Sequence, residues 1–172
     1  MSRRLLPLAA LLAPLLAVAG STALAQSSAL KGHNTNAPVD ISADRIEVQD
    51  RADRATFSGN VVAKQAEMTL AAPRITVAYQ NAGKVQLKRI DATGGVTVTS
   101  PSERATGQTG IYDIDRRLIT LVGGVSLIRG DSHVNGGRLV IDLRSGRAVV
   151  DGGGPGSGGR VTGRFTVPQQ GS

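Results

Sequence analysis

The sequence predicts an all-β protein whose sheet curls repeatedly and keeps open edges at its two ends. From Pro38 onward, apolar residues recur at every second position, the period of a strand with one buried face. After residues 1–25, no window shows an apolar stripe at the helical period of about 3.6 residues. A short glycine motif also recurs along the chain, and glycine inside a strand usually marks a bulge or a sharp bend.

Residues 1–25 have the layout of a secretory signal peptide. Two arginines precede an almost wholly apolar run over residues 5–19, and Ala23 and Ala25 put small side chains where a signal peptidase cuts. The alternative is an uncleaved membrane anchor, but the run is shorter than the ~20 residues of a membrane span, and two prolines interrupt it. We therefore expect cleavage between Ala25 and Gln26 and export from the cytoplasm.

The exported part is expected to hold one domain. Residues 26–37 are polar and unpatterned, which predicts a flexible leader; residues 38–168 form the patterned domain and residues 169–172 a short tail. Loss of the signal peptide's two arginines lowers the net charge from +7 to +5. Cysteine is absent, so stability in an oxidising compartment must come from packing and backbone hydrogen bonds.

The alternation predicts many short strands. In chain order, the alternating apolar positions are Val39 and Ile41; Ile46 and Val48; Phe57, Val61 and Ala63; Ile75, Val77 and Tyr79; Val85 and Leu87; Val96 and Val98; Tyr112 and Ile114; Ile119 and Leu121; Val125 and Leu127; and Leu139, Ile141 and Leu143. Turn residues predict turns at 50–53, 80–83, 115–117, 135–137 and 144–146. After a glycine-rich loop at 152–159, residues 160–168 are predicted to form a last edge strand.

The glycine motif is an internal repeat. Residues 57–61, 92–96 and 121–125 share two residues, a glycine, an asparagine or glycine, and a valine. In each copy the valine follows the first glycine by two positions, so it lies on the same face of its strand. Equivalent bends at these points predict a stacked body, either jelly-roll-like or a solenoid.

The sequence offers little for covalent chemistry. His33, in the leader, and His133, in a predicted turn, are isolated and expected to be exposed, so neither predicts a metal site. Asp113 and Asp115 could form an acid–base pair, but ordinary turn chemistry explains them better. No nucleophile elbow, phosphate loop or dinucleotide fingerprint is present. We expect neither an enzyme nor a cofactor.

The basic balance, with a pI near 10.8, is compatible with nucleic acid, acidic surfaces or phosphorylated lipid. Nucleic acid is disfavoured by export and by the lack of aromatic residues among the arginines for base stacking. Two interpretations of the basic cluster stay open: a solvated polar face, or attraction to lipid phosphates. The cluster comprises Arg116, Arg117, Arg129, Arg138, Arg144 and Arg147.

Residues 38–44, followed by residues 55–62, resemble the N-terminal signature of the OstA-like family of lipopolysaccharide transport proteins. The similarity continues through short motifs and covers nearly all of residues 38–168. These further motifs are Met68–Leu70, Gly107–Tyr112, Leu121–Val125, Arg160–Thr162 and Val167–Pro168. The motifs are degenerate, but their order and spacing along the chain are specific.

The resemblance implies an elongated, twisted antiparallel β-jelly roll, open at both ends, with the acyl chains of lipopolysaccharide (lipid A) inside. It also implies units joined end to end between an LptC-like inner-membrane protein and an LptD-like outer-membrane protein. A cleavable signal and the lack of a second domain favour the periplasmic carrier over these two partners, which share the fold. The loop at 152–159 is longer than the usual turn of the family.

Alternation and resemblance together name the candidate site residues. The lipid-binding interior is predicted to comprise Val39, Ile41, Phe57, Val61, Ile75, Val77, Val96, Val98, Tyr112, Ile114, Ile119, Leu121, Val125, Leu127, Leu139 and Ile141. The N-terminal partner edge is predicted at Val39, Ile41 and Ile46, and the C-terminal partner edge at Val161, Phe165 and Val167.

Physical chemistry supports a carrier. Each acyl methylene kept from water contributes ~0.8 kcal/mol, so a chain of about twelve carbons represents ~10 kcal/mol. Scarce aromatic residues suggest a roomy interior of Val, Ile and Leu. The alternatives are a self-assembling structural β-repeat protein and an LptC-like subunit of the same pathway. An envelope enzyme or polysaccharide-binding module lacks the residues it would need.

Overall fold

The structure is a computed structural model that describes residues 30, 32–153 and 159–167. These residues form one ten-stranded antiparallel sheet and one short 3-10 helix, η1 (Asp50–Ala52), which confirms the all-β prediction. Neighbouring strands follow the order β1-β3-β4-β5-β6-β7-β8-β10, while β2 also pairs with β3 and β9 with β8. The strands are β1 (Val39–Ser42), β2 (Arg45–Gln49), β3 (Arg54–Gln65), β4 (Met68–Asn81), β5 (Val85–Thr99), β6 (Glu103–Asp113), β7 (Leu118–Arg129), β8 (Ser132–Asp142), β9 (Arg147–Asp151) and β10 (Thr162–Arg164).

Each long strand from β3 to β8 bends once, and the glycine repeat marks the bends of β3, β5 and β7. The pairing register shifts at Gly59–Asn60, Gly94–Gly95 and Gly123–Gly124, where the odd-numbered strand carries one residue more than the strand that follows it. All six residues have positive φ, a conformation that costs other residues about 1–2 kcal/mol. The predicted bends within strands are therefore confirmed. The motif occurs in every second strand, so each repeat consists of two strands.

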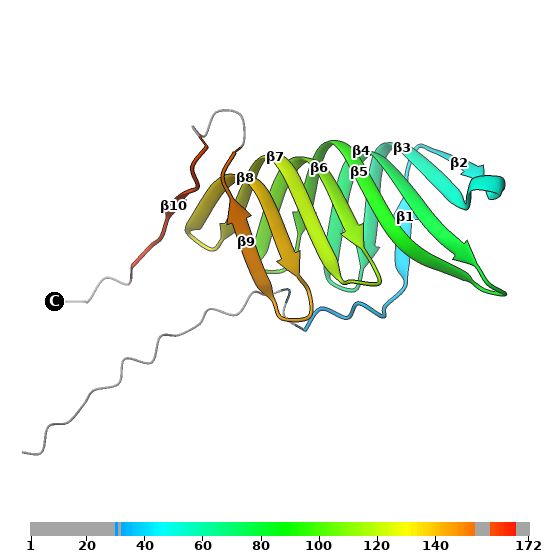
Figure 1. Ribbon diagram of the computed structural model, residues 1–172, viewed down its shortest axis with the longest axis horizontal. Coiled ribbons are helices and arrows are strands. Elements are labelled where there is room, and N and C mark those ends of the chain that lie inside the picture. Colours follow the sequence, from blue (N-terminus) through cyan, green and yellow to red (C-terminus); the bar gives the residue numbers. More distant parts are fainter. Residues whose placement is uncertain (1–29, 31, 154–158, 168–172) are drawn as a thin grey trace, which may run out of the picture.

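The bends divide the sheet into two arms. The β1 arm holds β1, β10 and the long-strand segments 61–65, 68–72, 96–99, 103–107, 125–129 and 132–136. The β2 arm holds β2, β9 and the segments 54–58, 74–81, 85–93, 109–113, 118–122 and 138–142. Figure 1 shows the bent strands stacked along the long axis of the molecule. The arms meet at the bends, so the hairpins between strands lie on the opposite, open side.

Two predicted elements differ from the structure. The turn predicted at 135–137 is wrong, because these residues lie inside β8 at its bend, and His133 therefore also belongs to a strand. The close approach of β9 explains the glycine at position 136, because a Cβ on Gly136 would lie 2.5 Å from Val150 Cγ1. The last predicted strand, residues 160–168, is shorter in the structure, where only Thr162–Arg164 pair, with β8.

The leader also differs from its prediction. Leu30 is buried and residues 32–37 lie against the body of the protein, whereas the polar sequence of residues 26–37 predicts a flexible segment. Backbone carbonyls of Thr35 and Ala37 accept hydrogen bonds from the side chain of Gln65. The predicted signal peptide and the predicted tail lie outside the described residues.

Candidate functional site: an apolar interior between two arms

The space between the arms is filled by one apolar cluster, and every residue predicted to face the interior belongs to it or packs against it. Half-buried members are Val39, Ile41, Phe57 and Ile114. Fully buried members are Val61, Ile75, Val77, Val96, Val98, Tyr112, Ile119, Leu121, Val125, Leu127, Leu139 and Ile141. The inward phase predicted from alternation is therefore correct; that these side chains contact lipid stays a prediction.

Several interior residues were missed by the sequence analysis. Their apolar pattern is weak, because the runs are short and contain alanine or charged residues. Ile90 and Ala92 on β5, for example, lie next to Arg89 and Asp91. The missed apolar residues are Met68, Leu70, Ala72, Ile90, Ala92 and Ala105, and the missed buried polar residues are Gln65, Ser100 and Glu103. Buried polar residues carry no apolar signal, so alternation alone could not reveal them.

The middle of the interior is close-packed. Ile75, Ile119, Leu121 and Leu139 each have an exposed fraction of 0%. Water therefore does not reach these side chains, as expected for a protein core at crystal-like density. The scarcity of large rings in the sequence suggests a roomy interior; instead, small branched side chains from both arms fill the space.

Open clefts lie at the two ends of the interior. The N-terminal cleft, of about 770 Å³, is lined by half-buried apolar residues and by Lys88, which pairs with Asp115 at 3.4 Å. Its apolar lining includes Val39, Ile41, Phe57, Leu87 and Ile114. The C-terminal cleft, of about 490 Å³, is lined by Leu127, Val134, Ala148, Val150, Val161 and Phe165, beside Arg129 and Arg147. The interior is thus closed in its middle and accessible at its ends.

A buried polar contact links the two arms. The Tyr112 hydroxyl, on the β2 arm, donates a hydrogen bond of 2.8 Å to Gln65 Oε1 on the β1 arm. His33 Nε2 lies 3.2 Å from the same oxygen, so His33 is half-buried rather than exposed. Burial raises the pKa of Tyr112 to about 12, against the opposing effects of Arg117 and of the Gln65 hydrogen bond. The phenol therefore stays neutral at physiological pH.

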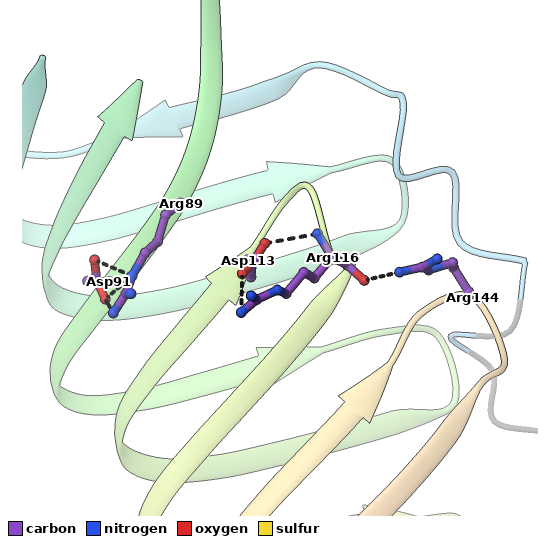
Figure 2. A network of polar contacts seen from close by, with 5 residues as sticks. All are labelled: Arg89, Asp91, Asp113, Arg116 and Arg144. Atoms are coloured by element: carbon purple, nitrogen blue, oxygen red, sulfur yellow. Dashed lines mark hydrogen bonds and ion pairs between the residues drawn. The ribbon is translucent and has the colours of Figure 1, made fainter. Parts of the chain in front are cut away.

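Charged side chains on the β2 arm form a surface network (Figure 2). Arg89 binds Asp91 at 2.6 Å, and Asp113 accepts a hydrogen bond from the backbone amide of Arg116. Arg144 donates to the backbone carbonyl of Arg116 at 3.0 Å. These contacts support turn chemistry as the role of Asp113.

The basic cluster is spread over both arms. Arg116 pairs with Asp113 at 3.7 Å, Arg138 with Asp151 at 4.0 Å, and Arg129 with buried Glu103. The pairs of Arg116 and Arg138 involve exposed side chains and support a solvated polar face, whereas Arg129 belongs to a largely buried ion pair. Arg116 and Arg117 lie in the β6–β7 hairpin and Arg144 in the β8–β9 hairpin, on the open side between the arms.

The exposed apolar residues gather at the sheet ends. Of the described residues, nine are large, apolar and exposed, and six of these lie there: Ile46, Val48, Val149, Val161, Phe165 and Val167. Ile46 belongs to β2, while Val161 and Phe165 flank β10 rather than forming part of it. Val39 and Ile41 belong to β1, so the residues predicted for each partner edge do lie at the corresponding end of the sheet.

The described residues show no sign of metal chemistry. Among them, no group of three or more His, Asp or Glu side chains is placed to hold a metal ion. Exposed His133 instead interacts with Ser126 Oγ at 2.9 Å and Asn135 Oδ1 at 2.8 Å. Within the same part of the chain, no helix is long and apolar enough to cross a membrane.

Comparisons with known proteins agree with this architecture. The family model for LptA/(LptD N-terminal domain) LPS transport protein matches residues 40–147. An uncharacterized protein of Rhizobium meliloti (strain 1021) is 34% identical over 164 residues, covering 85% of this chain and 86% of the relative. The crystal structure of LptH, the LptA-homologous periplasmic component of the lipopolysaccharide transport device of Pseudomonas aeruginosa, matches with a TM-score of 0.70.

The LptH match extends over 78% of this chain and 99% of that chain at 16% identity, and confirms the predicted β-jelly roll. The family model spans more than half of the sequence, which confirms the resemblance seen in its motifs. With the bent ten-stranded sheet and the apolar interior between its arms, these matches place the chain in the LptA/(LptD N-terminal domain) family of lipopolysaccharide transport proteins.

Proposed function

We propose that this protein carries lipopolysaccharide through the periplasm, holding the acyl chains between its two arms. One observation carries the proposal: a continuous apolar interior runs between two unpaired sheet edges. Each methylene shielded from water contributes ~0.8 kcal/mol, so such an interior meets the main energetic need of the cargo. Non-directional apolar contact also suits acyl chains, which have no hydrogen-bonding groups to recognise.

The two ends are proposed to act as docking edges. β1 and β2 at one end, and β9 and β10 at the other, each leave one side without a strand neighbour among the described residues. Such edges can extend a sheet by backbone pairing with another chain. The β1–β2 edge would receive cargo from an LptC-like inner-membrane protein. The β9–β10 edge would deliver it to a second copy or to an LptD-like outer-membrane protein.

Export supports the periplasmic setting. The signal-peptide pattern of residues 1–25 directs the chain across the inner membrane. LptH, whose fold this chain shares, is a periplasmic component of a lipopolysaccharide transport device. We propose the same compartment here, with cleavage between Ala25 and Gln26.

Site-specific photo-crosslinking in cells tests the cargo. Val98 on β5 is 2% exposed and faces the interior, whereas neighbouring Thr97 points to the other face of the same strand. A photoreactive residue at Val98 is expected to give a lipopolysaccharide adduct, and the matched probe at Thr97 to give none. Absence of lipid adducts at Val98, Tyr112 and Ile114 would overturn the carrier function.

A structural polymer is the second candidate, favoured by the exposed apolar residues at both ends. Such a protein would assemble edge to edge around a permanently dry core. Mass spectrometry of the gently purified protein separates the two candidates, because only the carrier co-purifies with lipid. Long assemblies without lipid would favour the polymer.

A further inference from the structure

Leu30 and residues 32–37 lie across the open side of the molecule, where the free ends of the two arms face each other. Figure 1 shows this blue segment passing along the lower ends of the strands before it turns up into β1. Leu30 and His33 share a pocket with Met68 and Pro101, at hairpins of the β1 arm. Asn36 Oδ1 accepts a hydrogen bond of 3.4 Å from Arg117, in a hairpin of the β2 arm. The segment therefore contacts both arms.

The anchoring of this segment is specific. Leu30 is only 3% exposed, although it lies near the start of a polar stretch. The Gln65 side chain, also 3% exposed, donates hydrogen bonds to the carbonyls of Thr35 (3.0 Å) and Ala37 (2.9 Å). Gln65 Oε1 meanwhile accepts from Tyr112 on the opposite arm. One buried amide thus joins the segment to both arms, and it would lose both acceptors if the segment left.

Acyl chains need a way into the middle of the interior, which is closed by tight packing. The bends join the arms covalently along one side, so the arms can separate only at the hairpin side. The central residues have exposed fractions near 0%, so a chain can enter only if the arms move apart. The segment and the Gln65–Tyr112 bond tie the arms together on that side.

We propose that Leu30 and residues 32–37 belong to a strap that closes the interior in the unloaded protein and is displaced when acyl chains enter. This inference rests on the proposed carrier function and adds its gate. In this proposal, the Leu30 side chain and the acyl chains compete for the same place on the open side, between the free ends of the two arms. When no lipid is bound, the strap covers the apolar interior. The strap leads directly into edge strand β1, so its release on loading would also affect the N-terminal edge of the sheet.

Thiol accessibility tests the strap, because the chain contains no cysteine. The full-length mature protein carrying Leu30→Cys is treated with a maleimide, with and without saturating lipid A. The thiol is expected to react slowly without lipid and at least about tenfold faster with it, as a buried side chain becomes exposed. Asn34→Cys, exposed at the start, reports the rate of a free thiol, and Ala92→Cys, 1% exposed in the core, reports general loosening.

The outcomes separate this proposal from the carrier function. If lipid A binds and the thiol of the Leu30→Cys variant stays protected, the strap is a fixed structural element and the proposal fails, while the carrier function stands. Equal acceleration at position 92 would also overturn it, since the whole interior would then open. If lipid A does not bind at all, the carrier function fails first.

Affinity supplies a second measurement that does not depend on a cysteine variant. Leu30→Ala weakens the closed strap, so a larger fraction of the protein is open and lipid A is expected to bind roughly tenfold more tightly. Unchanged or weaker binding by a folded Leu30→Ala protein would contradict displacement. Ile128→Ala, altered at an exposed position on β7 outside the strap, is expected to bind as the wild type does.

Discussion

At the scale of single residues, backbone conformation and side-chain contact both limit what can occupy a bend. Gly95 and Gly123 each have positive φ, at 96° and 85°. A Cβ at Gly95 would meet nothing within 4 Å, but one at Gly123 would lie 2.8 Å from Gln108 Cβ. The same residue type is therefore needed for conformation alone at one bend and for conformation and space at another.

Two alanine variants separate these effects. Gly95→Ala is expected to lower the free energy of unfolding by about 1–2 kcal/mol, the cost of a left-handed conformation for a residue with a Cβ. Gly123→Ala should cost clearly more, because β6 must also move away. Urea unfolding measures both; equal losses would show that the contact with Gln108 relaxes freely.

Tyr112 predicts a pH dependence of stability. Its pKa is about 12 in the folded protein and about 10 in the unfolded chain. The folded state therefore binds more protons between these values, and the free energy of unfolding falls as pH rises through them, by up to ~1.4 kcal/mol per pH unit. The stability advantage of the wild type over Tyr112→Phe should shrink between about pH 10 and pH 12 in urea titrations. A constant difference would exclude Tyr112 as the titrating group.

At the scale of elements, each end of the sheet consists of two short strands, which pair with the two halves of the bent long strand beside them. β1 and β2 pair with the two halves of β3, and β10 and β9 with the two halves of β8. Between β1 and β2, the amide of Asp44 donates to the carbonyl of Gly59 at 3.0 Å, and its side chain accepts from Asn60. The edge is thus shaped by the bend beside it.

A charge on an edge strand should block end-to-end pairing. Ile46, 55% exposed on β2, is available to a partner, so Ile46→Lys is expected to weaken self-association at least several-fold while leaving the fold intact. Ile128→Lys is the matched control, because Ile128 is 41% exposed but lies on β7, flanked by strands on both sides. Sedimentation velocity measures association; equal effects of both variants would contradict edge pairing.

At the scale of the whole molecule, a simple strand order builds a long body. From β3 to β8 every strand pairs with the next one along the chain. Each hairpin extends the same apolar interior, so length is gained without a new core. The net charge of +5 expected after signal cleavage favours a negatively charged cargo over a neutral one.

Cargo binding should therefore depend on salt and on the arginines of the open side. Affinity for lipopolysaccharide is expected to fall as ionic strength rises, because exposed charges are screened beyond about 10 Å at 0.1 M salt. Arg144→Glu, in the β8–β9 hairpin, should weaken binding several-fold at low salt. Arg138→Glu, beside the bend of β8 and paired with Asp151, should change it little. Equal losses for both variants would show attraction by overall charge rather than recognition at the open side.

The strand class, the inward phase and the bends all follow from local patterns in the amino-acid sequence. Alternation is local, so Ile119 and Leu121 could be placed inside from their neighbours alone. Bends were also predictable, because positive φ selects glycine locally, as at Gly94.

Which segments contact one another, by contrast, depends on the folded arrangement of the whole chain. Glycines in 135–137 suit a turn and a bend equally well, and pairing of Gly136 with β7 and the close approach of β9 decide in favour of a bend. Burial of Leu30 and Gln65 could not be predicted from local sequence either, because it also depends on which segments contact one another. A buried polar side chain depends on partners distant in sequence, Tyr112 being 47 residues from Gln65, and no short pattern encodes such a contact.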